Sequence, residues 1–231
     1  WGQAYGGISN CNRVIYQLDN LDFEVTGKES VIAELEVARA YWYYILCEAF
    51  GNVPIVDRFD VPEGFLPETS SREEVFAFIE NSIKNNVDKL SDDTKTYYGR
   101  FNKWNAKMLL ARLYLNAESW IGKNMYTECM ALCTEIMNSN KYALENDYSA
   151  PFYAQNEGSQ EIIFAYPADE VKTGSTIYMA LQKTLHPSNV KTFNLQTWLD
   201  NGVCAVPTFI DTYEEGDKRL PKTWRMGQQY G

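Results

Sequence analysis

Aromatic and amide side chains interleave in "FNLQTWLDNG", residues 193–202, and this mixture suits the binding of a small polar ligand. A flat ring covers the C–H face of a sugar, while amides and carboxylates hydrogen-bond its hydroxyl groups. Rings such as Trp198 and Phe193 would stack on the sugar. Asn201, Gln196 and Asp200 would bind its hydroxyls. The competing interpretation is that Trp198 only pins this segment to the rest of the chain.

Catalytic chemistry finds little support in the residue types. His186 is the single histidine, which excludes a multi-histidine metal site and leaves one candidate for any histidine dyad. It lies in "TLHPSNV" without a nucleophile motif, so we expect a surface or ligand-contact role. Paired acids could indicate a glycosidase, but Glu214 and Glu215 lie in "TYEEGDKR", which is typical of a solvated turn in which Asp217 pairs with Arg219. We expect no catalytic residue, no cofactor and no metal ligand.

The composition excludes some partners. A net charge of −10 argues against nucleic acid, because binding a polyanion needs a basic face. No apolar run approaches the roughly 18 residues of a membrane-spanning helix. None of the five cysteines forms a CxxC pair, and all are interpreted as small buried hydrophobic residues. They are Cys11, Cys47, Cys129, Cys133 and Cys204.

The elements that must position these residues are mainly helices. Apolar residues recur at helical spacing over residues 3–19, 30–50, 70–90, 102–119 and 126–139. In "ARAYWYYILCEAFGNVPIV", residues 38–56, two faces of one helix are apolar, and Gly51 and Pro54 end it. A helix that is apolar on two faces lies between neighbours. The four aromatic residues at 41–44 are therefore predicted to be core residues rather than a ligand platform.

The helices are predicted to form pairs. Leu110, Ala111 and Tyr114 fit the first helix of a tetratricopeptide repeat, although a generic array of helical hairpins fits nearly as well. We therefore expect a mainly α fold, with a tetratricopeptide-like scaffold over residues 1–140. Residues 141–231 are predicted to be a loop-rich segment that binds the ligand, with a short strand at "EIIFAYP", residues 161–167.

Five stretches, in this order, resemble the SusD/RagB family of outer-membrane nutrient-binding lipoproteins of Bacteroidetes. They are "NCNRVIYQLD", "ELEVARAYWYYILCEAFGNVPIV", "YGRFNKWNAKMLLARLYLNA", "YALENDYSAPFYAQNEGSQEIIFAYP" and "NGVCAVPTFIDTYEEGDKR". The resemblance implies a tetratricopeptide-like scaffold that carries loops, a lipid anchor on the outer face of the outer membrane, and a SusC-like TonB-dependent transporter as partner. It also implies that the protein is not an enzyme.

The resemblance also implies where a ligand would bind. Members of the family are roughly twice as long, so we expect this chain to be a fragment, with the lipid anchor and one aromatic arm of the site outside it. Positions that match ligand loops of the starch-binding member are Tyr178 and the region of Asn201-Gly202. The Trp beside that Asn-Gly in the starch binder is absent here; Val203 follows directly, and Trp198 lies just before. Because of this departure, the ligand could be a glycan other than starch.

The sequence therefore predicts cell-surface binding of an oligo- or polysaccharide and its delivery to a transporter. Its candidate ligand-binding residues are Trp198, Tyr178, Asn201, Phe193 and His186. One alternative is RagB-like capture of peptide at the same location, which would use backbone hydrogen bonds and charged termini. The other is an intracellular tetratricopeptide adaptor that holds a partner's peptide in its groove.

Overall fold

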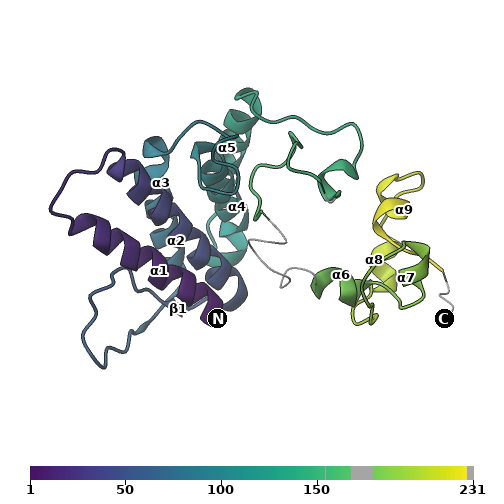
Figure 1. The fold of residues 1–231 in the computed structure, drawn as a ribbon, viewed down its shortest axis with the longest axis horizontal. Helices are drawn as coiled ribbons and strands as arrows, with labels where there is room; N and C mark the ends of the chain where they lie inside the picture. Colours follow the sequence, from purple (N-terminus) through teal and green to yellow (C-terminus); the bar gives the residue numbers. More distant parts are fainter. Residues whose placement is uncertain (154, 168–178, 228–231) are drawn as a thin grey trace. The chain divides into compact units, whose positions relative to one another are not determined.

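The structure, a computed structural model, describes residues 1–153, 155–167 and 179–227. By contacts within the chain it divides into two compact units, Trp1–Leu144 with Ser159–Ala165, and Glu145–Gly158 with Tyr166–Gly231. The first unit contains α1 (Gly2–Asp19), α2 (Lys28–Phe50), β1 (Val53–Pro54), β2 (Thr69–Ser70), α3 (Arg72–Asn86), η1 (Val87–Lys89), α4 (Lys103–Ile121) and α5 (Tyr126–Asn138). The second contains η2 (Ala150–Phe152), α6 (Met179–Thr184), α7 (Asn189–Thr192), α8 (Pro207–Ile210) and α9 (Arg219–Thr223). The mainly α fold class is confirmed (Figure 1).

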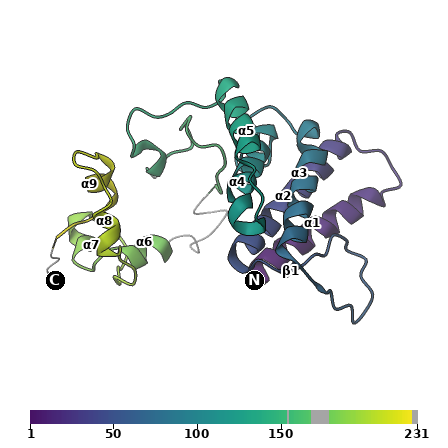
Figure 2. The same cartoon turned by 180° about the vertical axis from the view of Figure 1, so that it is seen from behind.

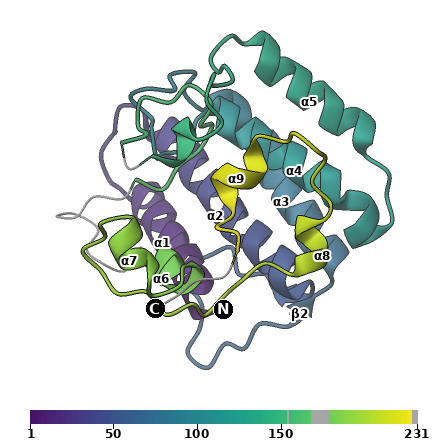
Figure 3. The same ribbon diagram turned by 90° about the vertical axis from the view of Figure 1, so that its right-hand side faces the viewer.

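Each long helix of the first unit packs against the next one in the chain. Contacts join α1 to α2, α2 to α3, α3 to α4 and α4 to α5. Figure 3 shows the five helices in this order, and Figure 2 shows them from behind the view of Figure 1. Small residues allow close approach: a Cβ on Gly7 of α1 would lie 2.3 Å from Trp42 Nε1. The helical-pair scaffold is thus built by sequential neighbours.

The aromatic run of α2 is part of the core, as the two-faced helix predicts. Tyr43 and Tyr44 are buried, and Tyr41 and Trp42 are half-buried and pack against the core. In α4, Ala111 and Tyr114 are buried, and the Tyr114 hydroxyl donates to Glu80 Oε1 of α3 at 2.8 Å. In α4 a buried small residue is therefore followed, three positions later, by a tyrosine that bridges to the neighbouring helix, as the repeat pattern predicts.

Local signals set the helix ends. Ser71 caps α3 with a reciprocal capping box, in which Ser71 N donates to Glu74 Oε2 at 2.7 Å and Glu74 N donates to Ser71 Oγ. Gly51 ends α2 with a φ of 74°. A Cβ there would also lie 2.9 Å from Arg72 Nε, so both the backbone angle and the space favour glycine.

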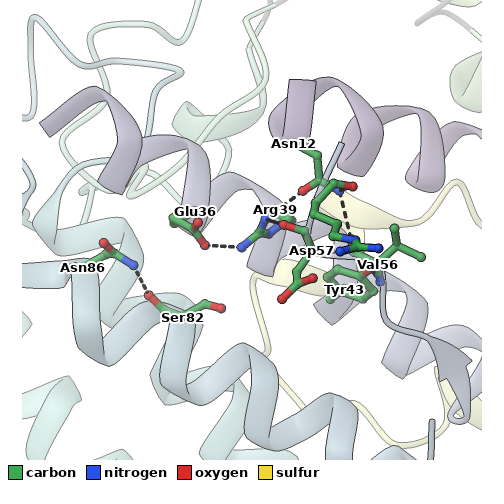
Figure 4. Close-up of polar contacts among 9 residues, drawn as sticks. Asn12, Glu36, Arg39, Tyr43, Val56, Asp57, Ser82 and Asn86 are labelled. Carbon is green, nitrogen blue, oxygen red and sulfur yellow. Dashed lines mark hydrogen bonds and ion pairs between the residues drawn. The ribbon is translucent and has the colours of Figure 1, made fainter. Parts of the chain in front are cut away.

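A buried arginine joins α1, α2 and the segment that follows α2 (Figure 4). Arg39 Nη1 donates to Asn12 Oδ1 and to the Asp57 carbonyl, both at 2.7 Å, and Arg39 forms an ion pair with Glu36. Its guanidinium also lies 5.5 Å from the centre of the Phe78 ring of α3. One side chain therefore ties four parts of the scaffold together.

Two expectations from the sequence are wrong. Residues 161–167 form no strand; instead Phe164 stacks on Phe101, with ring centres 4.8 Å apart, and packs at 5.7 Å from Tyr41. A short apolar run looks the same in sequence whether it joins a sheet or packs its side chains on helices. The short strands lie elsewhere, at β1 and β2, which pair antiparallel with Val53 opposite Ser70.

The second error concerns the cysteines. Cys11 and Cys47 are buried and Cys129 and Cys133 are half-buried, but Cys204 is exposed. Burial raises the pKa of the Cys47 thiol to about 11, which fits its role as a small core residue. Cys204 follows the irregular stretch after α7, where no helical periodicity places it on a buried face.

We expect Arg39→Leu to destabilise the scaffold by about 3–5 kcal/mol, because it leaves Glu36 and the Asn12 amide without their buried partner. The matched control is Arg100→Leu, which removes the exposed arginine of the Arg100–Glu34 ion pair and should cost less than about 1 kcal/mol. Urea unfolding monitored by circular dichroism measures both. Equal losses in the two variants would contradict a special role for Arg39.

Candidate ligand-binding site around Trp198

Residues 197–203, which we call the strap, lie across the end of helix α6. Backbone N–H groups of Asp200, Asn201 and Val203 donate to the carbonyls of Gln182, Leu185 and Lys183, at 2.9, 3.1 and 2.7 Å. The last carbonyls of a helix have no partner within the helix, so the strap satisfies them. The position of the strap is therefore fixed by its backbone.

Two residues of the strap have backbone requirements of their own. Asn201 has a φ of 53°, in the left-handed region where asparagine is among the few side chains tolerated. At Gly202 an added Cβ would lie 3.2 Å from Lys183 Cδ and 3.4 Å from Asp200 Oδ1. The Asn-Gly pair thus allows the chain to turn close to α6.

Trp198 is presented outward by this arrangement. Its side chain is 58% exposed, whereas the next residue, Leu199, is buried. Lys183 Nζ lies 5.7 Å from the centre of the indole ring and also forms an ion pair with Asp200. A cation over one face of an exposed tryptophan contributes about 0.5–1 kcal/mol and holds the ring in place. In the described structure, Trp198 is an exposed ring on a fixed support.

Polar groups accompany the ring. Gln182 Nε2 donates to Thr197 Oγ1 at 2.8 Å, directly beside Trp198, and Gln196 is exposed on the other side of Thr197. The structure brings Trp198, Asp200 and Asn201 together on one strap. Sequence reasoning missed Lys183 and Gln182, because their partners lie 17 and 15 residues further along the chain and no local pattern connects them.

The other candidates lie on separate local structures. Phe193 is exposed at the end of α7, with Arg225 Cζ 6.0 Å from its ring centre. His186 Nδ1 lies 2.8 Å from Ser188 Oγ and accepts from Ser188 N at 3.2 Å, so its ring forms part of the turn that begins α7. Tyr178 lies outside the described residues. A ligand role for each of these three stays a prediction.

The acidic turn behaves as the sequence predicts. Arg219 donates to Asp217 through Nη2 at 2.6 Å and through Nε at 3.0 Å, and this pairing lowers the pKa of the Asp217 carboxyl. Across the described ranges, no three His, Cys, Asp or Glu side chains gather where they could hold a metal ion. The same residues include no helix with the length and apolar character needed to cross a membrane.

Comparison with known proteins identifies the class to which the helical scaffold belongs. Residues 1–115 match the model of a SusD-like family described as "Starch-binding associating with outer membrane". The starch-binding protein SusD of Bacteroides thetaiotaomicron is 30% identical over 156 residues, which are 64% of this chain and 27% of that protein. A SusD-like protein of Bacteroides ovatus is 25% identical over 71% of this chain and 32% of its own length. The chain belongs to the SusD family.

Solved structures show the same fold. A SusD superfamily protein from Parabacteroides distasonis matches with a TM-score of 0.80 at 24% identity, over 95% of this chain and 47% of that one. A laminarin-binding SusD-like protein matches with a TM-score of 0.63 at 23% identity, over 71% of this chain and 36% of that one. The chain spans about a third or less of the length of the relatives that it matches in sequence.

Substitutions at Asn201 test the support of the ring. Asn201→Gly should keep the strap, because glycine adopts a positive φ without strain. Asn201→Val should destabilise it by roughly 1–2 kcal/mol, because a β-branched side chain resists that conformation. Proteolysis at residues 197–203 reports on the strap: faster cleavage in Asn201→Val alone is expected. Equal protection in both variants would show that the left-handed turn does not hold it.

Proposed function

We propose that this chain belongs to a cell-surface protein that binds an oligo- or polysaccharide without cleaving it. The observation that carries the proposal is Trp198, an exposed ring fixed on a hydrogen-bonded strap. Membership of the SusD family supports the same class of ligand, since the Bacteroides thetaiotaomicron relative is named as starch-binding and a similar solved structure as laminarin-binding.

The geometry suits stacking on a sugar. Lys183 lies over one face of the indole, so a pyranose would stack against the other face. Because Leu199 and three backbone hydrogen bonds already fix the strap, little conformational entropy is lost when the sugar binds. Asp200 and the Asn201 amide would then hydrogen-bond the hydroxyl groups at the edge of the sugar.

We further propose where the protein acts. A lipid anchor outside this chain would hold it on the outer face of the outer membrane, and a SusC-like TonB-dependent transporter would receive the glycan. The family description, association with the outer membrane, supports this location. Residues 141–231 would supply the ligand-binding segment, and Tyr178, Phe193 and His186 would be further contacts along the glycan.

Trp198→Ala in the full-length protein should weaken glycan binding by about tenfold to hundredfold, because a stacked, partly buried ring contributes roughly 1–3 kcal/mol. Affinity gels containing starch, laminarin or other polysaccharides measure the retardation. The melting temperature should stay unchanged, since the side chain is exposed.

The matched control is Phe23→Ala, which removes an aromatic ring of similar exposure, 62%, from the scaffold. It should leave retardation unchanged. Intact binding by Trp198→Ala with a lowered melting temperature would mean that Trp198 pins the segment. Binding of peptides in place of any polysaccharide by the unsubstituted protein would favour the RagB-like alternative.

The non-catalytic part of the proposal has its own test. Glu214→Gln and Glu215→Gln should leave binding unchanged, and neither the parent nor the variants should release reducing sugar, because these acids are proposed to have no catalytic role. Release of reducing sugar by purified protein, lost in either variant, would show that the protein is a glycosidase.

A further inference from the structure

A loop far from the strap in sequence carries an unusual surface. Every residue from 57 to 66 is exposed, in the stretch "DRFDVPEGFL". Its exposed large hydrophobic residues are Phe59, Val61, Phe65 and Leu66, and Leu66 is 88% exposed. Apolar side chains scattered singly over a surface are ordinary, but four within eight residues make this segment a candidate contact surface.

Both ends of this loop, residues 57–68, are firmly held, and Figure 4 shows the first of them. At the first end, Asn12 Nδ2 donates to the carbonyls of Val56 and Arg58 at 2.9 and 3.2 Å, and Val56 N donates to the Tyr43 hydroxyl at 2.7 Å. At the other end, β2 pairs with β1 and begins directly after the loop. The buried network of Arg39 therefore sets the base from which the loop projects.

The loop itself is locally ordered. Phe65 N donates to the Pro62 carbonyl at 3.1 Å across a tight turn in which Gly64 has a φ of 76°. Phe59 packs on Tyr16 of α1, with ring centres 5.7 Å apart. Pro62 and Pro67 flank the turn and restrict the backbone further. A surface ordered before binding loses less entropy when a partner docks.

The charges around these apolar residues have one dominant sign. The loop contains four acids, Asp57, Asp60, Glu63 and Glu68, against one base, Arg58. None of the five forms an ion pair within the part of the chain that the structure describes. An acidic rim around an apolar centre complements a partner with a basic rim around an apolar groove.

The side chains of this loop favour a protein as the binding partner over a sugar or a lipid surface. Leu66 and Val61 have no flat face to stack on a sugar, and the loop contains no Asn, Gln, Trp or Tyr to bind hydroxyls. Its excess of acids would be repelled by an anionic lipid surface. Aromatic and aliphatic side chains at the centre with charges at the rim are the usual anatomy of a protein interface.

We propose that the 57–68 loop is a docking element for a protein partner that presents an apolar groove with a basic rim. This inference rests on the proposed function, in which that partner is the TonB-dependent transporter. The loop belongs to the helical scaffold and the strap to the second unit, so docking and glycan binding use different residues.

The test uses full-length protein co-expressed with the proposed transporter and purified through a tag on the transporter. Leu66→Ser should weaken the association by about tenfold or more, because a few central apolar residues dominate an interface. The matched control is Leu144→Ser, which alters a leucine of similar exposure, 86%, outside the loop. It should leave the complex unchanged. Both variants should keep the parent's melting temperature and glycan retardation.

Charge reversal gives a second readout. Glu63→Lys should weaken the association and reduce its dependence on salt, whereas Glu24→Lys, at an exposed acid outside the loop, should do neither. Unchanged association of Leu66→Ser and Glu63→Lys would overturn the docking role. A lowered melting temperature in Leu66→Ser would also overturn it, since the loop would then be covered by the protein's own chain.

Failure of the two proposals can be told apart. If the unsubstituted protein does not associate with the transporter, both the proposed partner and the docking role of the loop are wrong, while the effect of Trp198→Ala on glycan retardation still stands or falls by itself. If association is normal but insensitive to the loop variants, only the docking role is wrong.

Discussion

The buried guanidinium of Arg39 is the constraint on which the scaffold depends. A charge removed from water must be paired and hydrogen-bonded, or it destabilises the fold by several kcal/mol. Arg39 meets this requirement at its two terminal nitrogens, Nη1 and Nη2, only when Asn12 of α1, Glu36 of α2 and the carbonyl of Asp57 converge on it, while its buried Nε has no hydrogen-bond partner in the described structure. Hydrophobic packing between helices tolerates small displacements, but the hydrogen bonds and the ion pair of Arg39 do not. The network therefore fixes the register of α1 against α2 and the path of the chain beyond α2.

The consequence extends to the surface. Tyr43 donates to the Val56 carbonyl at 3.1 Å and accepts from Val56 N, and burial raises the pKa of the Tyr43 hydroxyl, so it stays neutral in both roles. Tyr5 holds the Pro54 carbonyl at 2.8 Å in the same way. The aromatic run at 41–44 thus has a structural role rather than that of a ligand platform. Its Tyr43 holds the backbone from which the exposed 57–68 loop begins.

Local sequence signals made the helices and their caps predictable, whereas contacts between residues far apart in the sequence could not be predicted. The periodicity of α2, Gly51 at its end and the Ser71 capping box each lie within one or two turns of sequence, so the rules of helix formation suffice. The prediction of a strand at 161–167 was wrong because the ring of Phe164 packs on the rings of Phe101 and Tyr41, which lie more than 60 residues away in the sequence. In the candidate site, the sequence predicted Trp198 and Asn201 from composition and turn chemistry. It could not predict Lys183, whose position over the ring follows from where the strap meets α6.

The exposure of Trp198 follows from the placement of its neighbour. Leu199 is buried, and the N–H groups of Asp200, Asn201 and Val203 are bound to the end of α6. A shift of the strap by one residue would break these three hydrogen bonds and move Asn201 out of the left-handed turn. In the proposed binding mode, Leu199 would act only through the position of Trp198, whereas Asn201 would both hold the turn and hydrogen-bond the sugar. A change at Leu199 would therefore alter affinity although no contact with the sugar is lost.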